Sequence, residues 1–132
     1  MNYDKLYLGF TYDEPLEKLG GFAILVGMMT LSEQSLSVEY EIRDTMIGVI
    51  KSKPKKIEFK FNEIVSCIYE KTWFKSNFKL RTNVFLSSKG FLNSTGNELV
   101  FKIKKEDAEL AKEFVSAVNF RIADAYIKRM EG

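Results

Sequence analysis

The sequence predicts a mainly β protein in which about seven antiparallel strands, arranged as a sandwich or barrel, precede one long C-terminal helix. Two observations support this fold class. Three segments alternate apolar and polar residues with the period of a β-strand, and the end of the chain changes to the period of a helix. Turn residues also separate the short strands at regular spacing, which is typical of antiparallel sandwiches and barrels.

The alternating segments are residues 35–43, 56–62 and 98–104. In the first of them, Leu36, Val38 and Tyr40 alternate with serine and glutamate residues. Successive side chains of a strand point to opposite faces of a sheet. Each segment is therefore expected to have one buried face and one face in water.

Further strands are predicted over residues 22–30, 64–71, 78–83 and 84–92. Residues 22–30 are apolar on both faces, as in a central strand, and Gly27 within them marks a bend or a bulge. Residues 64–71 follow directly after Asn62 and Glu63, so we expect a sharp corner between two strands at that point.

A C-terminal helix is predicted over about residues 106–129, because apolar residues recur there three and four positions apart. Acidic residues in its first turn and basic residues in its last turn suit the helix dipole. We expect the apolar stripe to pack on the sheet or to plug the open end of a barrel. The stripe consists of Ala108, Ala111, Val115, Val118, Ile122 and Ala125, widened by Leu110, Phe114 and Tyr126.

The 132 residues contain no repeat, linker or low-complexity tract, so a single domain is expected over residues 1–132. Its core is expected at about residues 22–128, with residues 1–21 forming an N-terminal arm or an extra strand. The first residues lack the features of a secretory signal, and the longest apolar stretch, residues 19–31, is too short to span a bilayer as a helix. These observations predict a cytoplasmic protein.

The composition excludes several classes of enzyme. The chain has no histidine and a single cysteine, so it can build neither a histidine-dependent nucleophile nor an internal disulfide nor a thiolate-rich zinc site. Cys67, between Val65 and Ile68, is expected to be a small buried hydrophobic residue. Glu39 and Glu41 lie on the polar face of their strand and are interpreted as solubilising residues. We therefore expect no enzyme, no catalytic residue, no metal site and no cofactor.

The net charge of +2 conceals an uneven distribution. Residues 1–41 carry two basic residues against seven acidic ones, whereas residues 42–105 carry 14 against five. Residues 106–132 carry four basic residues against six acidic ones. The basic middle segment marks either a surface for anionic partners or strand faces that are simply rich in lysine, and both interpretations stay open.

Residues 56–68, Lys-Ile-Glu-Phe-Lys-Phe-Asn-Glu-Ile-Val-Ser-Cys-Ile, resemble the signature of bacterial pleckstrin-homology-like (PH-like) and GRAM-like domains. In that signature a short strand runs into a polar-Glu-Ile-x-x-Ile corner. Trp73-Phe74 with residues 78–82 resembles the aromatic hairpin that follows, and residues 100–103 with the helix resemble the last strand and helix. The resemblance covers about residues 22–128. It implies a bent antiparallel sheet or partly open barrel of about seven strands, capped by one long C-terminal helix.

The resemblance implies a binding or assembly module that acts in protein–protein interaction or self-association as a homo-oligomer. The alternative is peripheral binding of an anionic lipid or another anionic ligand at a membrane, because eukaryotic relatives bind phosphoinositides through a basic loop. The nearest basic loop, residues 51–56, contains Lys51, Lys53, Lys55 and Lys56. It lacks the arginine of the family's lipid pattern, and a solvated turn is the other interpretation.

The aromatic pair Trp73 and Phe74 is a candidate interface, because exposed aromatic residues on a hairpin often anchor contacts. The other interpretation is that both rings fold back onto the core. Aromatic residues interleaved with lysine in this region also resemble a stacking platform for nucleic acid. However, Phe78 has the inward phase of its strand and most of the eleven phenylalanines are needed in the core, so nucleic acid is not expected as a partner.

Overall fold

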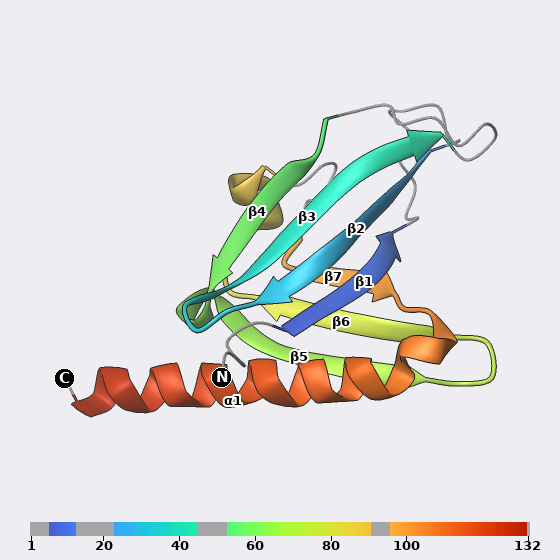
Figure 1. Ribbon diagram of the computed structural model, residues 1–132. Helices are drawn as coiled ribbons and strands as arrows, with labels where there is room; N and C mark the ends of the chain where they lie inside the picture. The colour runs from blue at the N-terminus through green and yellow to red at the C-terminus, as the bar shows by residue number, and fades with distance from the viewer. Residues whose placement is uncertain (1–5, 13–22, 45–52, 91–95, 132) are drawn as a thin grey trace.

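A computed structural model gives the structure of the protein and describes residues 6–12, 23–44, 53–90 and 96–131. These ranges contain seven strands, three short 3₁₀ helices and one long α-helix (Figure 1). In chain order the elements are β1 (Leu6–Tyr12), β2 (Ala23–Leu31), β3 (Ser35–Asp44), β4 (Lys55–Lys60), η2 (Phe61–Glu63), β5 (Ile64–Lys71), β6 (Ser76–Thr82), η3 (Leu86–Lys89), β7 (Glu98–Lys102), η4 (Lys105–Asp107) and α1 (Ala108–Glu131).

All seven strands belong to one antiparallel sheet in the order β4-β3-β2-β1-β7-β6-β5. Strand β1 pairs with β2 along its whole length but with β7 only at Thr11 and Lys102. The sheet bends at this short pairing, so the axes of β2–β4 are inclined to those of β5–β7 (Figure 1). Helix α1 lies alongside β5. A bent antiparallel sheet of seven strands with one long C-terminal helix is the predicted fold class, which is confirmed.

The core is formed by the alternate side chains that the sequence pattern assigns to the buried faces. Phe101 lies at its centre, with ring centroids 4.3 Å from Phe10 and 6.4 Å from Phe78. Phe78 in turn lies 5.8 Å from Phe114 of α1. All four rings are almost completely buried. Through these rings both halves of the sheet and the helix share one apolar core.

The close packing in the middle of the sheet requires a residue without a side chain at position 27, which is Gly27. The register of β2 with both of its neighbours is continuous through this residue, so no bulge lies there. A Cβ atom at Gly27 would instead overlap the carbonyl oxygen of Glu39 and lie 2.9 Å from Phe10 Cζ. Glycine is required at this position because strand β3 and the ring of Phe10 approach the backbone closely.

One alternative of the prediction is decided by the structure, and one predicted strand is wrong. The N-terminal segment, expected as an arm or an extra strand, contributes β1 at the centre of the sheet. The predicted strand over residues 84–92 is wrong, since residues 86–89 form η3, which ends at Gly90 in the left-handed conformation with φ 82°. Glycine readily adopts this conformation at the end of a helical turn. The last two residues of that predicted strand lie outside the described ranges.

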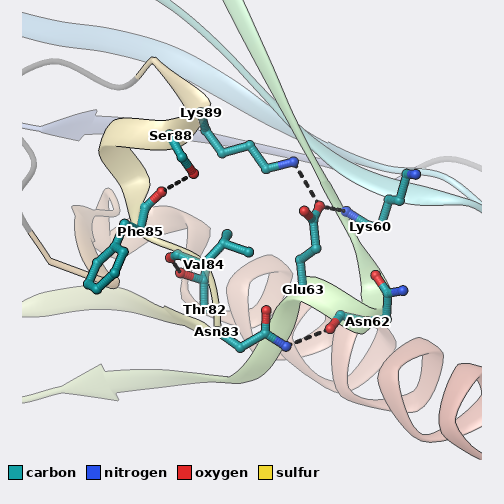
Figure 2. Close-up of polar contacts among 9 residues, drawn as sticks. All are labelled: Lys60, Asn62, Glu63, Thr82, Asn83, Val84, Phe85, Ser88 and Lys89. Atoms are coloured by element: carbon teal, nitrogen blue, oxygen red, sulfur yellow. Dashed lines mark hydrogen bonds and ion pairs between the residues drawn. The ribbon is translucent and has the colours of Figure 1, made fainter.

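The predicted corner at Asn62 and Glu63 is confirmed as η2, and polar contacts tie it to the segment after β6 (Figure 2). Glu63 Oε1 accepts hydrogen bonds from the backbone N–H of Lys60 at 2.9 Å and from Lys89 Nζ at 2.8 Å. Asn83 Nδ2 donates to the carbonyl oxygen of Asn62 at 2.6 Å. Burial raises the pKa of Glu63, but the hydrogen bonds and charges of Lys89 and Lys60 outweigh it, so the pKa lies below its ordinary value.

Helix α1 begins two residues after the predicted start and buries the N-terminal part of the predicted stripe, through Val118. Ile122 and Ala125 are half-buried, whereas Leu110 and Tyr126 are exposed and do not widen the buried face. No helix in the described ranges combines the length and the apolar character needed to cross a membrane.

Candidate functional site

Strands β5 and β6 are joined by a turn, Thr72–Lys75, which we call the aromatic tip. The backbone N–H of Thr72 donates to the carbonyl oxygen of Lys75 at 2.8 Å. The hydroxyl oxygen of Thr72 accepts hydrogen bonds from the N–H groups of Phe74 at 3.3 Å and Lys75 at 3.0 Å. Threonine commonly organises turns in this way, and here it gives the tip a defined backbone shape.

The aromatic tip presents two large rings to solvent. Trp73 is 89% exposed and Phe74 is 94% exposed, the two highest values among the large hydrophobic residues of the described ranges. Neither ring folds back onto the core, which was one of the two interpretations of the sequence. Since large apolar surfaces are normally removed from water, this pair is the most conspicuous candidate contact surface of the described part of the chain.

Three exposed lysines lie at the aromatic tip. Lys71 precedes the tip, Lys75 ends it, and Lys105 lies beside it, whereas Lys104 lines a separate hollow with Gly27 and Asp107. The N–H of Ile103 donates to the carbonyl oxygen of Ser76 at 2.8 Å, which fixes this arrangement.

Lys105 also makes direct contact with the tip, because its Nζ donates to the carbonyl oxygen of Trp73 at 2.9 Å. A hollow of about 410 Å³ lies at this point, lined by Lys71, Thr72, Trp73 and Lys105. The carboxylate nearest to the tip in the chain is that of Glu70, which pairs with Lys79 at 3.1 Å, and Glu106 and Asp107 follow Lys105 in η4. Because Asp107 lines the hollow that contains Lys104, the three lysines at the tip leave an excess of positive charge there.

The predicted lysine loop is divided by the start of a strand. Lys51 lies outside the described residues, Lys53 is exposed before the strand, and Lys55 and Lys56 belong to β4. Lys56 lies opposite Glu39 in the sheet register, and its Nζ is 3.6 Å from a carboxylate oxygen of Glu58. Strand β4 is one edge of the sheet and β5 the other, so the sheet order does not bring these lysines to the aromatic tip.

Cys67 is buried on β5, as predicted. Burial raises the pKa of its thiol to about 12. Asn119 of α1 donates from Nδ2 to the carbonyl oxygen of Cys67 at 3.0 Å and accepts the N–H of Cys67 at 3.4 Å. A protonated thiol enclosed under a helix has the character of a structural residue and not of a nucleophile.

A second apolar surface lies on the outer side of α1. Phe120, Ile127 and Met130 are 67%, 54% and 72% exposed. Their spacing of seven and then three residues places them on one face of the helix. The sequence analysis did not identify this face, although these residues are apolar and out of phase with the buried stripe.

Phe78 is completely buried, as its strand phase predicts, so it cannot serve as a stacking platform. Phe85, which the stacking-platform interpretation would also use, is 67% exposed on the segment that precedes η3. Phe91 lies outside the described residues. Among the described residues, no group of three or more acidic or cysteine side chains is placed to hold a metal ion.

Comparison with known proteins finds no matching family model, no matching curated protein and no matching solved structure.

Proposed function

We propose that the chain is a non-enzymatic, PH-like binding module that contacts its partner through the aromatic tip. One observation carries this proposal: Trp73 and Phe74 are almost fully exposed on a turn whose backbone is fixed by hydrogen bonds. Large aromatic rings gain free energy when they leave water, and rings held in a defined position lose little entropy on binding. The pair is therefore suited to anchor a contact outside the fold.

The sheet order and the long C-terminal helix support the PH-like assignment, because both agree with what the sequence resemblance implies. The chemistry of the described side chains supports a binding role over catalysis. The thiol of Cys67 is protonated and enclosed, and Glu41 forms a surface ion pair with Arg43 at 2.7 Å. Neither group resembles an activated acid, base or nucleophile.

The proposal is tested by replacing both rings, Trp73→Ser with Phe74→Ser, and measuring retention of the folded protein on a phenyl matrix. The matched control is Phe85→Ser, which removes another exposed ring from a different part of the surface. We expect a clear loss of retention for the double variant, a smaller loss for the control, and unchanged thermal unfolding for both. Equal retention of the double variant and the unaltered protein would show that the tip is not a contact surface.

Self-association is a second candidate function, and the exposed face of α1 favours it. Phe120, Ile127 and Met130 form an apolar strip on a helix that a second copy could cover. Sedimentation equilibrium should give a mass above 15.3 kDa that returns to this value with Phe120→Ser and Met130→Ser. The matched control is Leu110→Ser, exposed near the start of the same helix. A strict monomer at high concentration contradicts this candidate.

Binding of an anionic ligand through residues 51–56 is a weaker candidate than binding of a partner through the aromatic tip. The exposure of Lys53, Lys55 and Lys56 supports it. However, Lys56 lies opposite Glu39 in the register and its Nζ is 3.6 Å from the carboxylate of Glu58, which reduces the positive potential that a ligand would meet.

A further inference from the structure

We propose that the partner of the aromatic tip is an anionic membrane surface, into which Trp73 and Phe74 insert while the surrounding lysines contact lipid headgroups. The inference rests on the proposed function, because it names the partner of the same tip. The partner is a lipid bilayer, and association with a protein is one outcome that the experiment distinguishes.

The two rings have the chemistry that the membrane interface selects. Tryptophan is enriched at the level of the headgroups, where its apolar ring is buried and its indole N–H stays hydrated. Phenylalanine has no polar atom and gains more from the hydrocarbon region. Trp73 and Phe74 are adjacent at the end of a hairpin that extends beyond the neighbouring strands (Figure 1). Insertion of this one turn can therefore place both rings in the bilayer.

Several backbone N–H and C=O groups of the tip already form hydrogen bonds within the protein, which suits a medium poor in water. The N–H groups of Thr72, Phe74 and Lys75 all donate within the turn. The carbonyl oxygens of Lys75 and Trp73 accept hydrogen bonds from the N–H of Thr72 and from Lys105 Nζ. A polar group that enters an apolar medium without a partner costs free energy. Internal hydrogen bonds remove that cost for these five groups.

The charge around the tip complements an anionic surface. Lys71 and Lys75 are exposed, and the ammonium group of Lys105 is already fixed beside Trp73. The acidic groups of this region are Glu70, which pairs with Lys79 at 3.1 Å, together with Glu106 and Asp107. Asp107 lines a separate hollow together with Lys104, so Lys71, Lys75 and Lys105 against Glu106 leave a positive surface around the rings. Lysine stems can lie along the apolar region while the ammonium groups remain at the headgroups.

The size of the tip favours a bilayer over a protein partner. Two aromatic rings bury roughly 300–500 Å² together. A stable protein interface of standard size buries about 800 Å² on each partner. A projecting turn with two rings reaches that area only if the partner has a matching cavity. A fluid bilayer adapts to the turn, and the hollow of about 410 Å³ beside Trp73 and Lys105 offers space for a headgroup.

Trp73 is the only tryptophan of the chain, so the intrinsic fluorescence reports directly on the tip. The experiment adds vesicles of phosphatidylcholine alone, or of phosphatidylcholine mixed with phosphatidylglycerol, to the full chain. We expect a blue shift of the emission and weaker quenching by acrylamide only with the anionic vesicles. Because exposed charges are screened by salt, raising the ionic strength should reduce the bound fraction.

Two variants that keep Trp73 as the reporter separate insertion from general electrostatic attraction. Phe74→Ser should weaken partitioning about tenfold or more, given the apolar surface that it removes. Its matched control, Phe85→Ser, should bind like the unaltered protein. Lys71→Gln with Lys75→Gln should weaken binding about 25-fold, at roughly fivefold for each lysine. Its matched control, Lys55→Gln with Lys56→Gln, removes the same charge from β4 and should have little effect.

Several results would overturn the membrane assignment. These are the absence of a shift with either vesicle, vesicle binding without a change in Trp73 emission, and equal losses for the two double lysine variants. A blue shift that depends on protein concentration and needs no vesicles would identify a second copy as the partner. In that case the membrane assignment fails while the tip remains a contact surface. Retention on the phenyl matrix that does not depend on Trp73 and Phe74 would remove both proposals.

Discussion

The side-chain amide of Asn119 pairs with the backbone of Cys67 in the way that a neighbouring strand would. Its Nδ2 donates to the carbonyl oxygen of Cys67 at 3.0 Å, and its Oδ1 accepts the N–H of Cys67 at 3.4 Å. Strand β5 is the last strand of the sheet, so these two backbone groups point away from β6. An exposed strand edge invites pairing with other chains. At this position helix α1 closes the edge with one residue.

We predict that Asn119→Ala destabilises the protein by about 1–2 kcal/mol. The substitution leaves the N–H and the carbonyl group of Cys67 without their partner beneath the helix, where water replaces it only in part. Urea unfolding measures the loss, with Ser116→Ala, exposed on the same helix, as the control. Equal stability of the two variants would show that water satisfies this edge as well as the amide does.

The thiol of Cys67 should react slowly in the folded protein. Its pKa is raised to about 12 from 9.0, so the reactive thiolate is scarce at neutral pH, and burial also blocks access of the reagent. Addition of Ellman's reagent should label the thiol slowly under native conditions and rapidly in denaturant. Because the raised pKa favours the neutral folded form, it should also make stability fall as the pH rises from about 9 toward 12. Fast labelling of the native protein contradicts this prediction.

Glu63 should contribute stability that depends on pH. Its pKa in the folded state lies below the ordinary value of 4.5, so the contribution is fully present above pH 4.5 and is lost as the pH falls through the folded pKa. We expect Glu63→Gln to cost about 1–2 kcal/mol at neutral pH, because the contacts with Lys89 and Lys60 are charge-assisted. The difference should shrink on acidification.

Urea unfolding at neutral and acidic pH measures the effect of Glu63→Gln. Glu98→Gln, an exposed carboxylate on β7, is the control and should change stability little at either pH. A cost of Glu63→Gln that stays constant with pH would show that the charge of Glu63 is not responsible for the stabilisation.

Two glycines of the central strands should respond very differently to alanine. Gly27→Ala should destabilise the protein by about 2–3 kcal/mol, because the new Cβ meets the backbone of Glu39, which cannot move without separating β2 from β3. Gly9→Ala is the matched control, since its Cβ would lie 3.9 Å from the carbonyl oxygen of Gly27, an ordinary contact. Thermal unfolding of the two variants checks the prediction, and equal midpoints would contradict it.

Local pattern was sufficient to predict the strands with one polar face, such as β3, because period-two alternation there coincides with burial. It failed over residues 84–92, where apolar residues suggested a strand. Only Leu86 is buried in η3, whereas Phe85 points to solvent, and Gly90 ends the turn. The sequence Ser-Ser-Lys-Gly was the signal of a short helical turn ending at a glycine.

The site was predictable only in part. Trp73 and Phe74 lie between two strands, and two adjacent rings there suggest an exposed turn. The contribution of Lys105 depends on β7 lying beside β6, a pairing between segments far apart in the chain. No local pattern encodes such a contact, and so the sequence analysis identified the rings but not all of the cations around them.

The position of β1 has a consequence for the way the chain folds. It is the first described strand but lies fourth in the sheet, and its pair with β7 joins Thr11 to Lys102. During synthesis β1 can pair with β2 early, but its other edge stays unpaired until β7 has been synthesised. Contacts between such distant segments slow folding, and an open strand meanwhile offers a place for other chains to attach. The nascent chain is thus most vulnerable to aggregation at the strand that later lies at the centre of the sheet.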